Sequence, residues 1–531
     1  MKKKQKHIVL RVLSLILWIA CMACVCYLSY QIYKANMLPT KYYYILIGVI
    51  VFLILLFIMF ILNKKTKVWI LIICDILFLT LSVVLYFANI KINETLKFLD
   101  QNLNAKYETN IYNIVVSKDS KIKSIKDLDS KTIKLVNDLD DKTLLETSIK
   151  RKIKNSKLEY TTSISDLLYE VKDNTEVIII VNSGNFDAMI EEDETYKDYI
   201  RIIDTIEIKS KVVNTATNIA VTEDPFVVYL SGIDTRSGKL PAKSLSDVNI
   251  LLVVNPVDRE LLMVNTPRDY YVNLHGIKGN KDKLTHAGLI GGVKLSTSTL
   301  EDLYEIKIPY YVRVNFNAVI NLVDAVGGIT INNDQNKNIK CWTDPSCIIK
   351  PGDNKVNGKC ALAFARERHA YKEGDRHRGE NQEQVISKII EKVTSSKTLI
   401  NNYSNILESL NGTFETNITT EEIMSLVKMQ INDMRGWTIS TYNVTGSDLY
   451  AKTYSYPNRD LYVMNPNMET VNIAKQKLND ALTINWYKKV IWTPFLGHKR
   501  NEVFICKEIK LYILKQISIK KVVTAYRKCY N

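Results

Sequence analysis

The sequence predicts an α/β protein that three N-terminal helices hold in a membrane. Two observations carry this prediction. The N-terminal region contains three apolar runs of roughly 20 residues, the length that crosses a hydrocarbon core of about 30 Å. The remaining chain alternates strand-like apolar runs with amphipathic helical stretches, as α/β domains do. We therefore divide the 531 residues into membrane helices (1–95), a small accessory α/β domain (96–220), a larger α/β core (221–480) and a basic tail (481–531).

The loops that flank the predicted transmembrane helices differ in charge. The helices are expected at Val12–Tyr33, Tyr42–Leu62 and Val68–Ile90. Lysines cluster before the first helix and before the third, whereas the intervening loop contains only Lys34 and Lys41. The positive-inside rule then places the N-terminus in the cytoplasm and everything after Ile90 outside, so we expect a multi-pass protein of the cell membrane. Asp75 lies within the third helix, where it is either functional or snorkels to the cytoplasmic end, and we assign it no role.

The net charge of +15 indicates an anionic partner. Nucleic acid and a membrane with phosphate-rich substrates are the two candidate classes. Because the predicted topology exports most of the chain, nucleic acid is disfavoured. We therefore expect the membrane and a phosphate-bearing ligand.

The cysteines fit an exported protein. Four of the nine fall in the apolar helices, where they behave as small apolar residues. Cys341 and Cys347 flank a short loop that contains Pro345, and we expect them to form a disulfide in an oxidising compartment. Zinc is disfavoured, because the cysteines show no C-x-x-C spacing and the histidines are scattered.

The accessory region alternates short strands and helices. We predict strands at Asn113–Val116, Thr132–Val136 and Val177–Val181, and helices at Lys142–Lys154 and Ile164–Val171. No catalytic cluster is visible in this part of the sequence, so we interpret it as an accessory or binding module.

The core begins with three apolar runs that read as strands covered on both faces. They are Phe226–Leu230, Val248–Val254 and Leu261–Val264. Polar residues border each one: Asp234 and Arg236 follow the first, Asp247 precedes the second, and Arg268 and Asp269 follow the third. Charged residues at the ends of buried strands occupy the usual ligand position of open α/β sheets. Beyond them we expect a helix that ends near Tyr304, a strand at Pro309–Phe316 and a helix that ends at Gly327-Gly328.

A second group of cations lies in a later arginine-rich stretch. If Leu362–Arg368 is extended, alternation puts Arg366 and Arg368 on one face beside apolar neighbours. Farther on, Arg378 and Gln382 fall on the apolar stripe of a predicted helix. Two interpretations stay open from this stretch alone, a site for a phosphate-bearing ligand with an apolar part, or a salt-bridge cluster. The acidic residues of such a cluster would be Glu367, Glu373 and Glu380.

The motifs of common enzyme classes are not found. The sequence has no G-x-S-x-G, no P-loop and no G-x-G-x-x-G, and we expect structural or surface roles for the isolated His286, His369 and His377. What remains is two aspartates, Asp234 and Asp247, together with the arginines. Carboxylates favour Mg²⁺, and guanidinium forks match phosphate oxygens. We therefore predict a Mg²⁺-assisted phosphoryl site, in which metal and arginines offset the charge of a leaving diphosphate.

Several motifs follow one another in order between Asp224 and Lys477. They are Gly-Ile-Asp-Thr-Arg, Ser-Asp-Val-Asn-Ile, Thr-Pro-Arg-Asp-Tyr-Tyr-Val, Asp-Lys-Leu-Thr-His-Ala-Gly, Val-Asp-Ala-Val-Gly-Gly, Ala-Phe-Ala-Arg-Glu-Arg and Gly-Asp-x-x-Arg-x-x-Asn-Gln. This order resembles the LytR–CpsA–Psr family, and the membrane helices with an accessory domain resemble its capsule-type branch. The resemblance implies a core with a central mixed sheet flanked by helices.

The resemblance also implies a Mg²⁺-dependent transferase. It would move an envelope polysaccharide, capsular or exopolysaccharide, from a polyprenyl-diphosphate carrier to a peptidoglycan hydroxyl, so no protein nucleophile is needed. Asp234 and Asp247 would hold Mg²⁺ and, with Arg268 and Arg366, form the catalytic set. The residues that would bind the pyrophosphate are Arg268, Arg366, Arg368, Arg378 and Gln382. Supporting roles would fall to Arg236, Asp269, Lys283 and Asp375. The lipid tail would lie in an apolar pocket of the core.

Two positions depart from the family pattern. Leu245 stands where the family commonly has an arginine, and Glu380 stands where capsule-type members often have another. Lys243 and Arg376 are the nearby residues that would compensate. Two alternatives stay open, namely hydrolysis of the same polyprenyl diphosphate, and a non-catalytic regulator whose partners include other proteins of polysaccharide assembly. For the basic tail, a surface-lying amphipathic helix and an unrelated extension are both open.

Overall fold

The computed structural model describes most of the chain up to position 484. The described residues are 2–36, 38–63, 65–103, 107–136, 142–161, 164–211, 219–233, 240–372, 374–395, 406 and 412–484. The interpretations of the basic tail fall outside them, apart from its first few residues.

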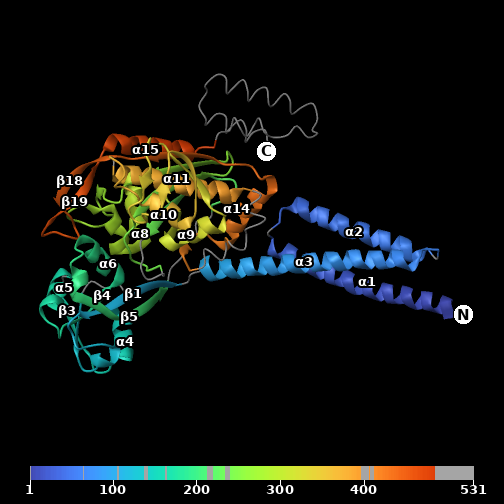
Figure 1. Cartoon of the computed structure of the whole chain (residues 1–531), viewed down its shortest axis with the longest axis horizontal. Helices are drawn as coiled ribbons and strands as arrows, with labels where there is room; N and C mark the ends of the chain where they lie inside the picture. The colour runs from blue at the N-terminus through green and yellow to red at the C-terminus, as the bar shows by residue number, and fades with distance from the viewer. Residues whose placement is uncertain are drawn as a thin grey trace, which may run out of the picture. The chain divides into compact units, whose positions relative to one another are not determined.

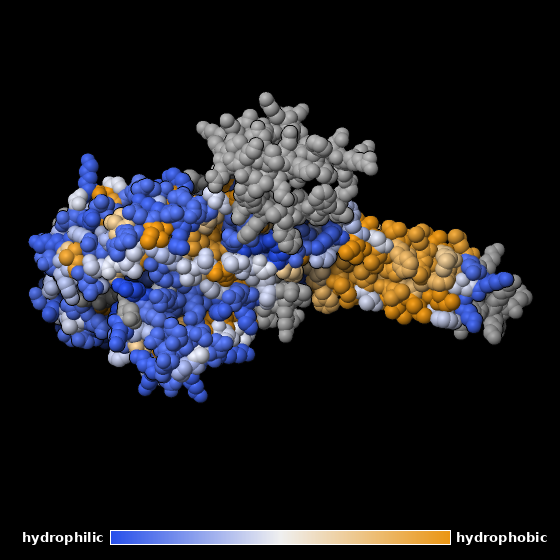
Figure 2. Space-filling view, turned by 90° about the horizontal axis from the view of Figure 1, so that it is seen from above, coloured by the Kyte–Doolittle hydropathy of each residue, from blue (hydrophilic) through white to orange (hydrophobic). Residues whose placement is uncertain are grey.

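The N-terminal region forms the three expected apolar helices (Figure 1). Their bounds are α1 Lys2–Ala35, α2 Thr40–Leu62 and α3 Val68–Leu103. Each is long and apolar enough to cross a membrane, and Figure 2 shows their surface as hydrophobic. Inside the bundle, Trp18 stacks on Phe57 at 4.5 Å between ring centroids. Asp75 is buried, and its carboxylate accepts a hydrogen bond from Ser14, which joins α3 to α1.

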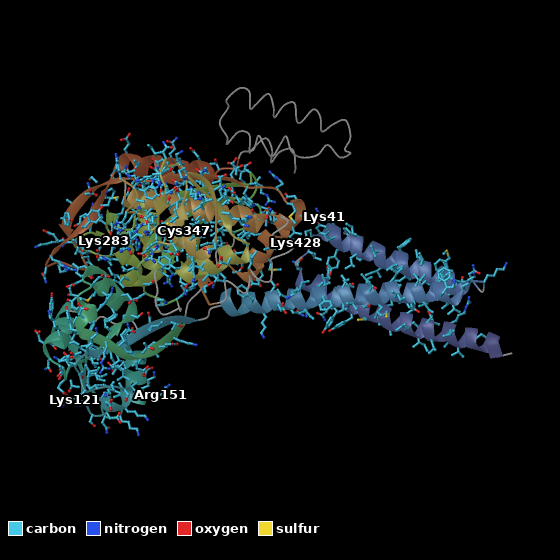
Figure 3. The ribbon with its side chains drawn as sticks, in the orientation of Figure 1. Lys41, Lys121, Arg151, Lys283, Cys347 and Lys428 are labelled. Atoms are coloured by element: carbon cyan, nitrogen blue, oxygen red, sulfur yellow. A yellow bond between two sulfur atoms is a disulfide. The ribbon has the colours of Figure 1, made fainter. Side chains whose placement is uncertain are left out.

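The accessory domain is a sheet with the strand order β3-β2-β4-β1-β5 and helices packed on it. Figure 3 labels Lys121 and Arg151 on this domain. Its strands are β1 Tyr107–Ser117, β2 Thr132–Val136, β3 Lys157–Thr161, β4 Ile178–Asn182 and β5 Ile200–Lys211. Its helices are η1 Ile125–Leu128, α4 Lys142–Lys152, α5 Ile164–Asp173, α6 Ser183–Glu192 and α7 Tyr196–Tyr199. All five predicted elements are confirmed. The edge strands β3 and β5 were not predicted, because charged residues interrupt their apolar pattern.

The core is organised around a mixed sheet with the strand order β16-β11-β6-β7-β8-β17. The strands are β6 Phe226–Ile233, β7 Val248–Asn255, β8 Glu260–Asn265, β11 Tyr310–Asn315, β16 Phe414–Thr416 and β17 Thr438–Asn443. The pairs β6–β11 and β8–β17 are parallel, whereas β7 is antiparallel to both of its neighbours. The predicted mixed α/β sheet is therefore confirmed.

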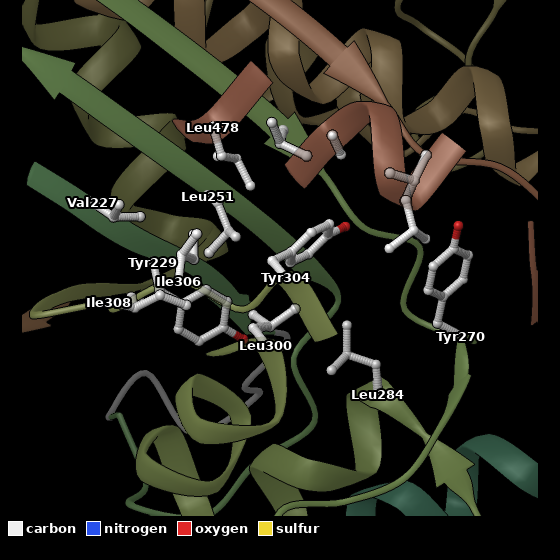
Figure 4. Close-up of a cluster of buried hydrophobic side chains, with 14 of the residues drawn as sticks. Val227, Tyr229, Leu251, Tyr270, Leu284, Leu300, Tyr304, Ile306, Ile308 and Leu478 are labelled. Carbon is white, nitrogen blue, oxygen red and sulfur yellow. The ribbon is translucent and has the colours of Figure 1, made fainter. Parts of the chain in front are cut away.

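Helices cover both faces of this sheet, as the unbroken apolar strands predict. Val227 and Tyr229 of β6 point into one cluster with helices α8 Leu284–Tyr304 and α15 Met468–Ala481 (Figure 4). Phe226 and Val228 point to the opposite face. There they pack in a second cluster with α11 Asp375–Thr394 and α14 Thr420–Asp433. The alternation along one strand thus separates two hydrophobic layers.

Beside the sheet lies a third cluster built from shorter elements. It contains α9 Phe316–Ala325, α10 Gly358–Ala365 and the hairpins β12 Ile329–Asn333/β15 Gly352–Val356 and β13 Ile339–Lys340/β14 Ile348–Ile349. Two further hairpins are β9 Tyr271–Val272/β10 Asp282–Lys283 and β18 Gly446–Lys452/β19 Asp460–Pro466. As predicted, α9 is followed by Gly327 and Gly328, which have φ angles of 79° and 84°.

The extended conformation predicted for Leu362–Arg368 is wrong, because Leu362–Ala365 form the second half of helix α10. Asn357 caps the helix and accepts a hydrogen bond from the backbone N–H of Cys360 at 3.0 Å. The alternation of alanine with Leu362 and Phe364 looked like a strand. Alanine is the best helix former, and the Asn357 cap stabilises the first turn, so the segment forms a helix.

The predicted disulfide between Cys341 and Cys347 is also wrong. Cys347 is bonded to Cys360 of α10 instead. Cys341 is a buried free thiol whose Sγ lies 3.5 Å from the Sγ of Cys347. The hairpin β13–β14 brings Cys341 and Cys347 together as expected. Cys360 was not considered as a partner because helix α10, which places it beside Cys347, was not predicted.

Candidate functional site

Several strands of the core terminate at one edge of the sheet. Ile233 at the end of β6 pairs with Asn315 at the end of β11, and Val248 at the start of β7 pairs with the neighbouring glycine of β6. Asn265 at the end of β8 pairs with Asn443 at the end of β17. Polar residues that follow or precede these positions are therefore brought together at this edge, as the sequence predicts for a ligand site.

A cavity of about 820 Å³ lies at this edge, within the size range of small-molecule sites. Eight of the predicted site residues line it, namely Asp247, Arg268, Asp269, Lys283, Arg366, Arg368, Arg378 and Gln382. The other predicted residues, Asp234, Arg236 and the side chain of Asp375, lie outside the described residues. The structure thus gathers residues from four separate stretches of the sequence around one space.

The cavity residues carry an excess of positive charge. Of all the described residues that line it, six are Lys or Arg and four are Asp or Glu. Arg268 contacts Asp247 at 2.5 Å between Nη1 and Oδ1, and Lys283 contacts Asp269 at 3.4 Å between Nζ and Oδ1. All four side chains are at most 15% exposed. Partly buried cations in excess favour an anionic ligand, because low exposure strengthens electrostatic attraction.

Arg366 and Arg368 share the cavity although the predicted strand is a helix. Helix α10 ends at Ala365, so Arg366 and Arg368 lie just beyond it. There the predicted alternation of side chains holds, and both arginines face the cavity. Arg366 caps the helix, and its guanidinium lies 4.5 Å from the ring centroid of Phe316. Glu367 points the other way, is 1% exposed and accepts backbone N–H bonds from Trp342 and Ala370.

Helix α11 presents two more cavity residues, Arg378 and Gln382, as its stripe predicts. Its neighbouring side chains fix the helix in place. The amide of Asn381 donates to the carbonyl oxygen of Phe364 at 3.1 Å, which ties α11 to α10. Glu383 is 2% exposed and accepts a hydrogen bond from Asn443 at 2.8 Å. Burial raises the pKa of Glu383 to about 8, so this carboxyl is largely protonated near neutral pH.

Two of the three acidic residues of the salt-bridge interpretation have described contacts with groups other than the arginines. Glu367 is occupied by the backbone N–H groups of the cysteine hairpin and the following turn. Glu380 is half exposed and pairs with His377 at 3.0 Å. The third acidic residue, Glu373, lies outside the described residues. The phosphate-site interpretation stays a prediction, and the gathering of the arginines around one cavity agrees with it.

The two departures from the family pattern are placed differently. Leu245 lines the main cavity, so the missing arginine would have faced the ligand. Glu380 faces His377, and the neighbouring Arg376 lines a small adjoining cavity of about 20 Å³. Of the two residues considered for compensation, the structure thus brings Arg376 next to the site.

The histidines are divided. His286 is 2% exposed and its Nδ1 lies 2.7 Å from Oδ1 of Asp282, which fits the expected structural role. Burial alone would raise the pKa of Asp282, but bonds to His286 and Ser455 hold this pKa below its ordinary value. His369 lines the cavity, which the sequence did not indicate.

Other cavity residues were missed at the level of sequence. They are Phe316, Trp342, Thr343, His369 and Tyr462 of the core, and Gly184, Asp187, Ile190, Glu194 and Lys197 of the accessory domain. The accessory residues carry no local signal, since only the packing of two domains brings them to the cavity. Trp342 and the other core residues of this list belong to none of the motifs that the sequence offered.

The donor set available to Mg²⁺ is sparse. Asp247 lines the cavity, and among the described residues no group of three or more metal-binding side chains is found. Mg²⁺ commonly binds one or two carboxylates and takes its remaining ligands from water and substrate phosphate. Asp247 beside an arginine-lined cavity fits that mode, with Asp234 as the predicted second ligand.

Comparison with known proteins agrees with the motif order. A family model described as the LytR_cpsA_psr family matches residues 193–484. "Biofilm regulatory protein A" of Streptococcus mutans is 35% identical over 38% of this chain, and the match spans about half of that relative (52%). "Polyisoprenyl-teichoic acid--peptidoglycan teichoic acid transferase TagU" of Bacillus licheniformis is 33% identical over 41% of this chain and 68% of its own length.

Two solved structures of similar proteins are named with a bound ligand. "TagT bound to LIIa-WTA" is 27% identical, covers 52% of this chain and 97% of its own, and has a TM-score of 0.40. "LytR-CPS2A-psr family protein YwtF (TagT) with bound octaprenyl pyrophosphate lipid" is 26% identical, with coverages of 51% and 96% and a TM-score of 0.38. Because the family model covers more than half of the 531 residues, this chain belongs to the LytR–CpsA–Psr family.

Proposed function

We propose that this protein is a membrane-anchored phosphotransferase that attaches an envelope glycopolymer to peptidoglycan. The observation that carries the proposal is the convergence of Arg268, Arg366, Arg368, Arg378 and Gln382 on one cavity with Asp247. Such a cavity suits a diphosphate, since guanidinium groups bind phosphate oxygens through paired, charge-assisted bonds.

The polymer is proposed from the relatives. Relatives from Bacillus are named as transferases that move teichoic acid from a polyisoprenyl carrier to peptidoglycan. We therefore place a teichoic-acid-like polymer first among the substrates to test, and the capsular polysaccharide or exopolysaccharide that the motifs suggested second. The carrier is proposed to be a polyprenyl diphosphate, whose lipid tail would enter an apolar part of the core.

In the proposed reaction, a peptidoglycan hydroxyl attacks the phosphorus that bears the sugar. A new oxygen–phosphorus bond forms and the bridging bond of the diphosphate breaks, so that polyprenyl phosphate leaves and its freed oxygen takes up the proton that the hydroxyl loses. The arginines hold the diphosphate and offset the negative charge that grows on the leaving phosphate. Asp247, with Asp234, would hold Mg²⁺, which would supply further neutralisation of that charge when bound.

The three apolar helices would keep the cavity close to the membrane-borne substrate. The lysine asymmetry of the loops supports an extracytoplasmic core, and we propose this orientation. Other proteins of polysaccharide assembly are proposed as partners in the same membrane. We do not propose nucleic acid as a partner, because the proposed orientation puts the core outside the cell.

The experiment uses the full-length chain in detergent with Mg²⁺, a short-chain polyprenyl-diphosphate oligosaccharide and peptidoglycan fragments. Mass spectrometry would detect a fragment linked to the sugar through phosphate. We expect a linked product that is lost in Arg366→Ala and kept in Arg151→Ala, whose arginine is exposed on the accessory domain. Released lipid phosphate without linkage would favour the hydrolase, and no reaction despite tight binding would favour the regulator.

A further inference from the structure

Trp342 stands out on the rim of the cavity because its side chain is exposed. Its relative exposure is 70%, and it lines the cavity together with Thr343 and His369. The rings of Trp342 and His369 lie 4.9 Å apart between centroids. Exposed apolar surface beside a cavity is typical of binding sites, and tryptophan is enriched among the residues that contribute most to binding.

The exposed ring is held by a rigid support. The backbone N–H of Trp342 donates to the buried carboxylate of Glu367, which lies between the two cavity arginines of the loop after α10. The backbone N–H of Cys341 donates to the carbonyl oxygen of Cys347 at 3.1 Å, and Cys347 is bonded to Cys360 of α10. The hairpin and helix α10 are thus fastened together by a covalent bond and hydrogen bonds. These contacts fix the backbone that carries the indole, and the ring itself lies against His369.

The position of Trp342 relative to the arginines gives the cavity a direction. The small adjoining cavity shares Asp247, Arg268 and Arg378 with the large one. Neither Trp342 nor His369 is among the described residues that line it. The indole therefore lies away from the part of the site that contains Asp247, Arg268 and Arg378, and on the side of the loop that carries Arg366 and Arg368. A ligand whose diphosphate is bound by these arginines would have the group attached to it, on the side of Arg366 and Arg368, beside Trp342.

We propose that Trp342 and His369 form a saccharide subsite, in which the indole face stacks on a pyranose ring. The apolar C–H face of a sugar matches a flat aromatic surface, and its hydroxyls are left for polar neighbours at the rim. Thr343 and Arg368 line the cavity beside the two rings and supply such polar groups. This inference rests on the proposed function, because a glycopolymer donor and a peptidoglycan acceptor both carry a pyranose there.

The test separates the two sources of the sugar. Full-length protein and Trp342→Ala would be titrated with farnesyl diphosphate, a farnesyl-diphosphate-linked disaccharide and a free peptidoglycan disaccharide. We expect Trp342→Ala to weaken a sugar-bearing ligand about 2- to 12-fold, the usual range for one aromatic stacking contact. Loss confined to the linked disaccharide identifies the donor sugar, and loss confined to the free disaccharide identifies the acceptor.

Two variants control for damage to the hairpin. Trp342→Phe keeps an aromatic face and should retain most of the affinity. Ile348→Ala removes a side chain of β14 that is 51% exposed and is not among the described cavity residues, so it should bind all ligands as the parent does. Equal weakening of sugar-free farnesyl diphosphate, or no weakening of any ligand, would overturn the subsite. Absence of transfer by the parent protein would instead count against the proposed function, since the binding measurements do not depend on turnover.

Discussion

Removing the guanidinium of Arg366 tests whether the arginine cavity binds diphosphate. The residue is well suited because its side chain lines the cavity while its backbone merely ends helix α10. Alanine is compatible with the right-handed backbone conformation that the residue has at the helix end. The variant should therefore fold and lose one cation from the cavity.

The size of the effect follows from the bonds that would be lost. One charge-assisted hydrogen bond to an ionised phosphate contributes about 1.5–3 kcal/mol. Because Arg268, Arg368 and Arg378 remain, we count one such bond, which corresponds to roughly 10- to 150-fold weaker binding. The contact with Phe316 adds stability to the folded protein and not to the complex. Arg366→Lys keeps the charge without the planar fork, so its loss should lie between those of the parent and the alanine variant.

The assay is calorimetric titration of the full-length chain in detergent with farnesyl diphosphate and Mg²⁺. Arg151→Ala is the matched control, because Arg151 is an exposed arginine in the last turn of α4. Affinities that are equal for parent and Arg366→Ala would refute the assignment of this cavity to the diphosphate. An equal loss in Arg151→Ala would indicate non-specific attraction by the net charge.

Three further predictions concern the frame around the cavity. In Gly379→Ala, the added Cβ would lie 2.2 Å from Nδ2 of Asn265, so α11 should shift and diphosphate affinity should fall, whereas Gly436→Ala has open space and should be neutral in the same titration. Burial raises the pKa of Glu383 from 4.5 to about 8, so its contribution to stability is full below pH 4.5 and is lost as the pH rises through about 8. Glu383→Gln cannot ionise, so the melting temperature of this variant should fall less than that of the parent protein over the same pH range. Cys360→Ser opens a loop of 13 residues and should lower the free energy of unfolding by about 3 kcal/mol in denaturant titrations, and mapping of the bonded cysteines by mass spectrometry checks the pairing.

The sequence predicts the cavity well where charge and strand ends coincide. Asp247 and Arg268 flank apolar strands, and a sheet that places strand ends together leaves them few other positions. Lys283 came from motif order and Gln382 from the apolar stripe of its helix, and both line the same space. These residues were found because each belongs to a local pattern that the fold preserves.

The arginines after α10 were placed correctly for the wrong reason. The alternation of Arg366 and Arg368 was attributed to a strand, but only the residues beyond the helix follow it. Burial of Glu367 between them settles their direction, because its carboxylate satisfies two backbone N–H groups of the neighbouring segments. Neither partner of Glu367 can be read from the sequence, since tertiary packing selects them.

The disulfide and the cavity residues of the accessory domain could not be predicted from local sequence patterns. Cys341 and Cys347 are close in sequence and in space, yet the bond joins Cys347 to a helix. Glu194 and Lys197 reach the cavity from another domain. In both cases the decisive contact joins elements whose packing has no periodic trace in the sequence.

The two departures from the family pattern have unequal weight once the geometry is known. Glu380 is turned to His377 and does not line the cavity described here, so its negative charge is partly offset and screened by solvent. Leu245 lines the cavity and exchanges a cation for apolar surface at a point where the ligand would pass. The change therefore lowers the positive charge of the cavity by one while four arginines and Lys283 remain. Because these cations still outnumber the acidic residues among the predicted site residues, the cavity keeps a positive charge that suits the diphosphate of the proposed function.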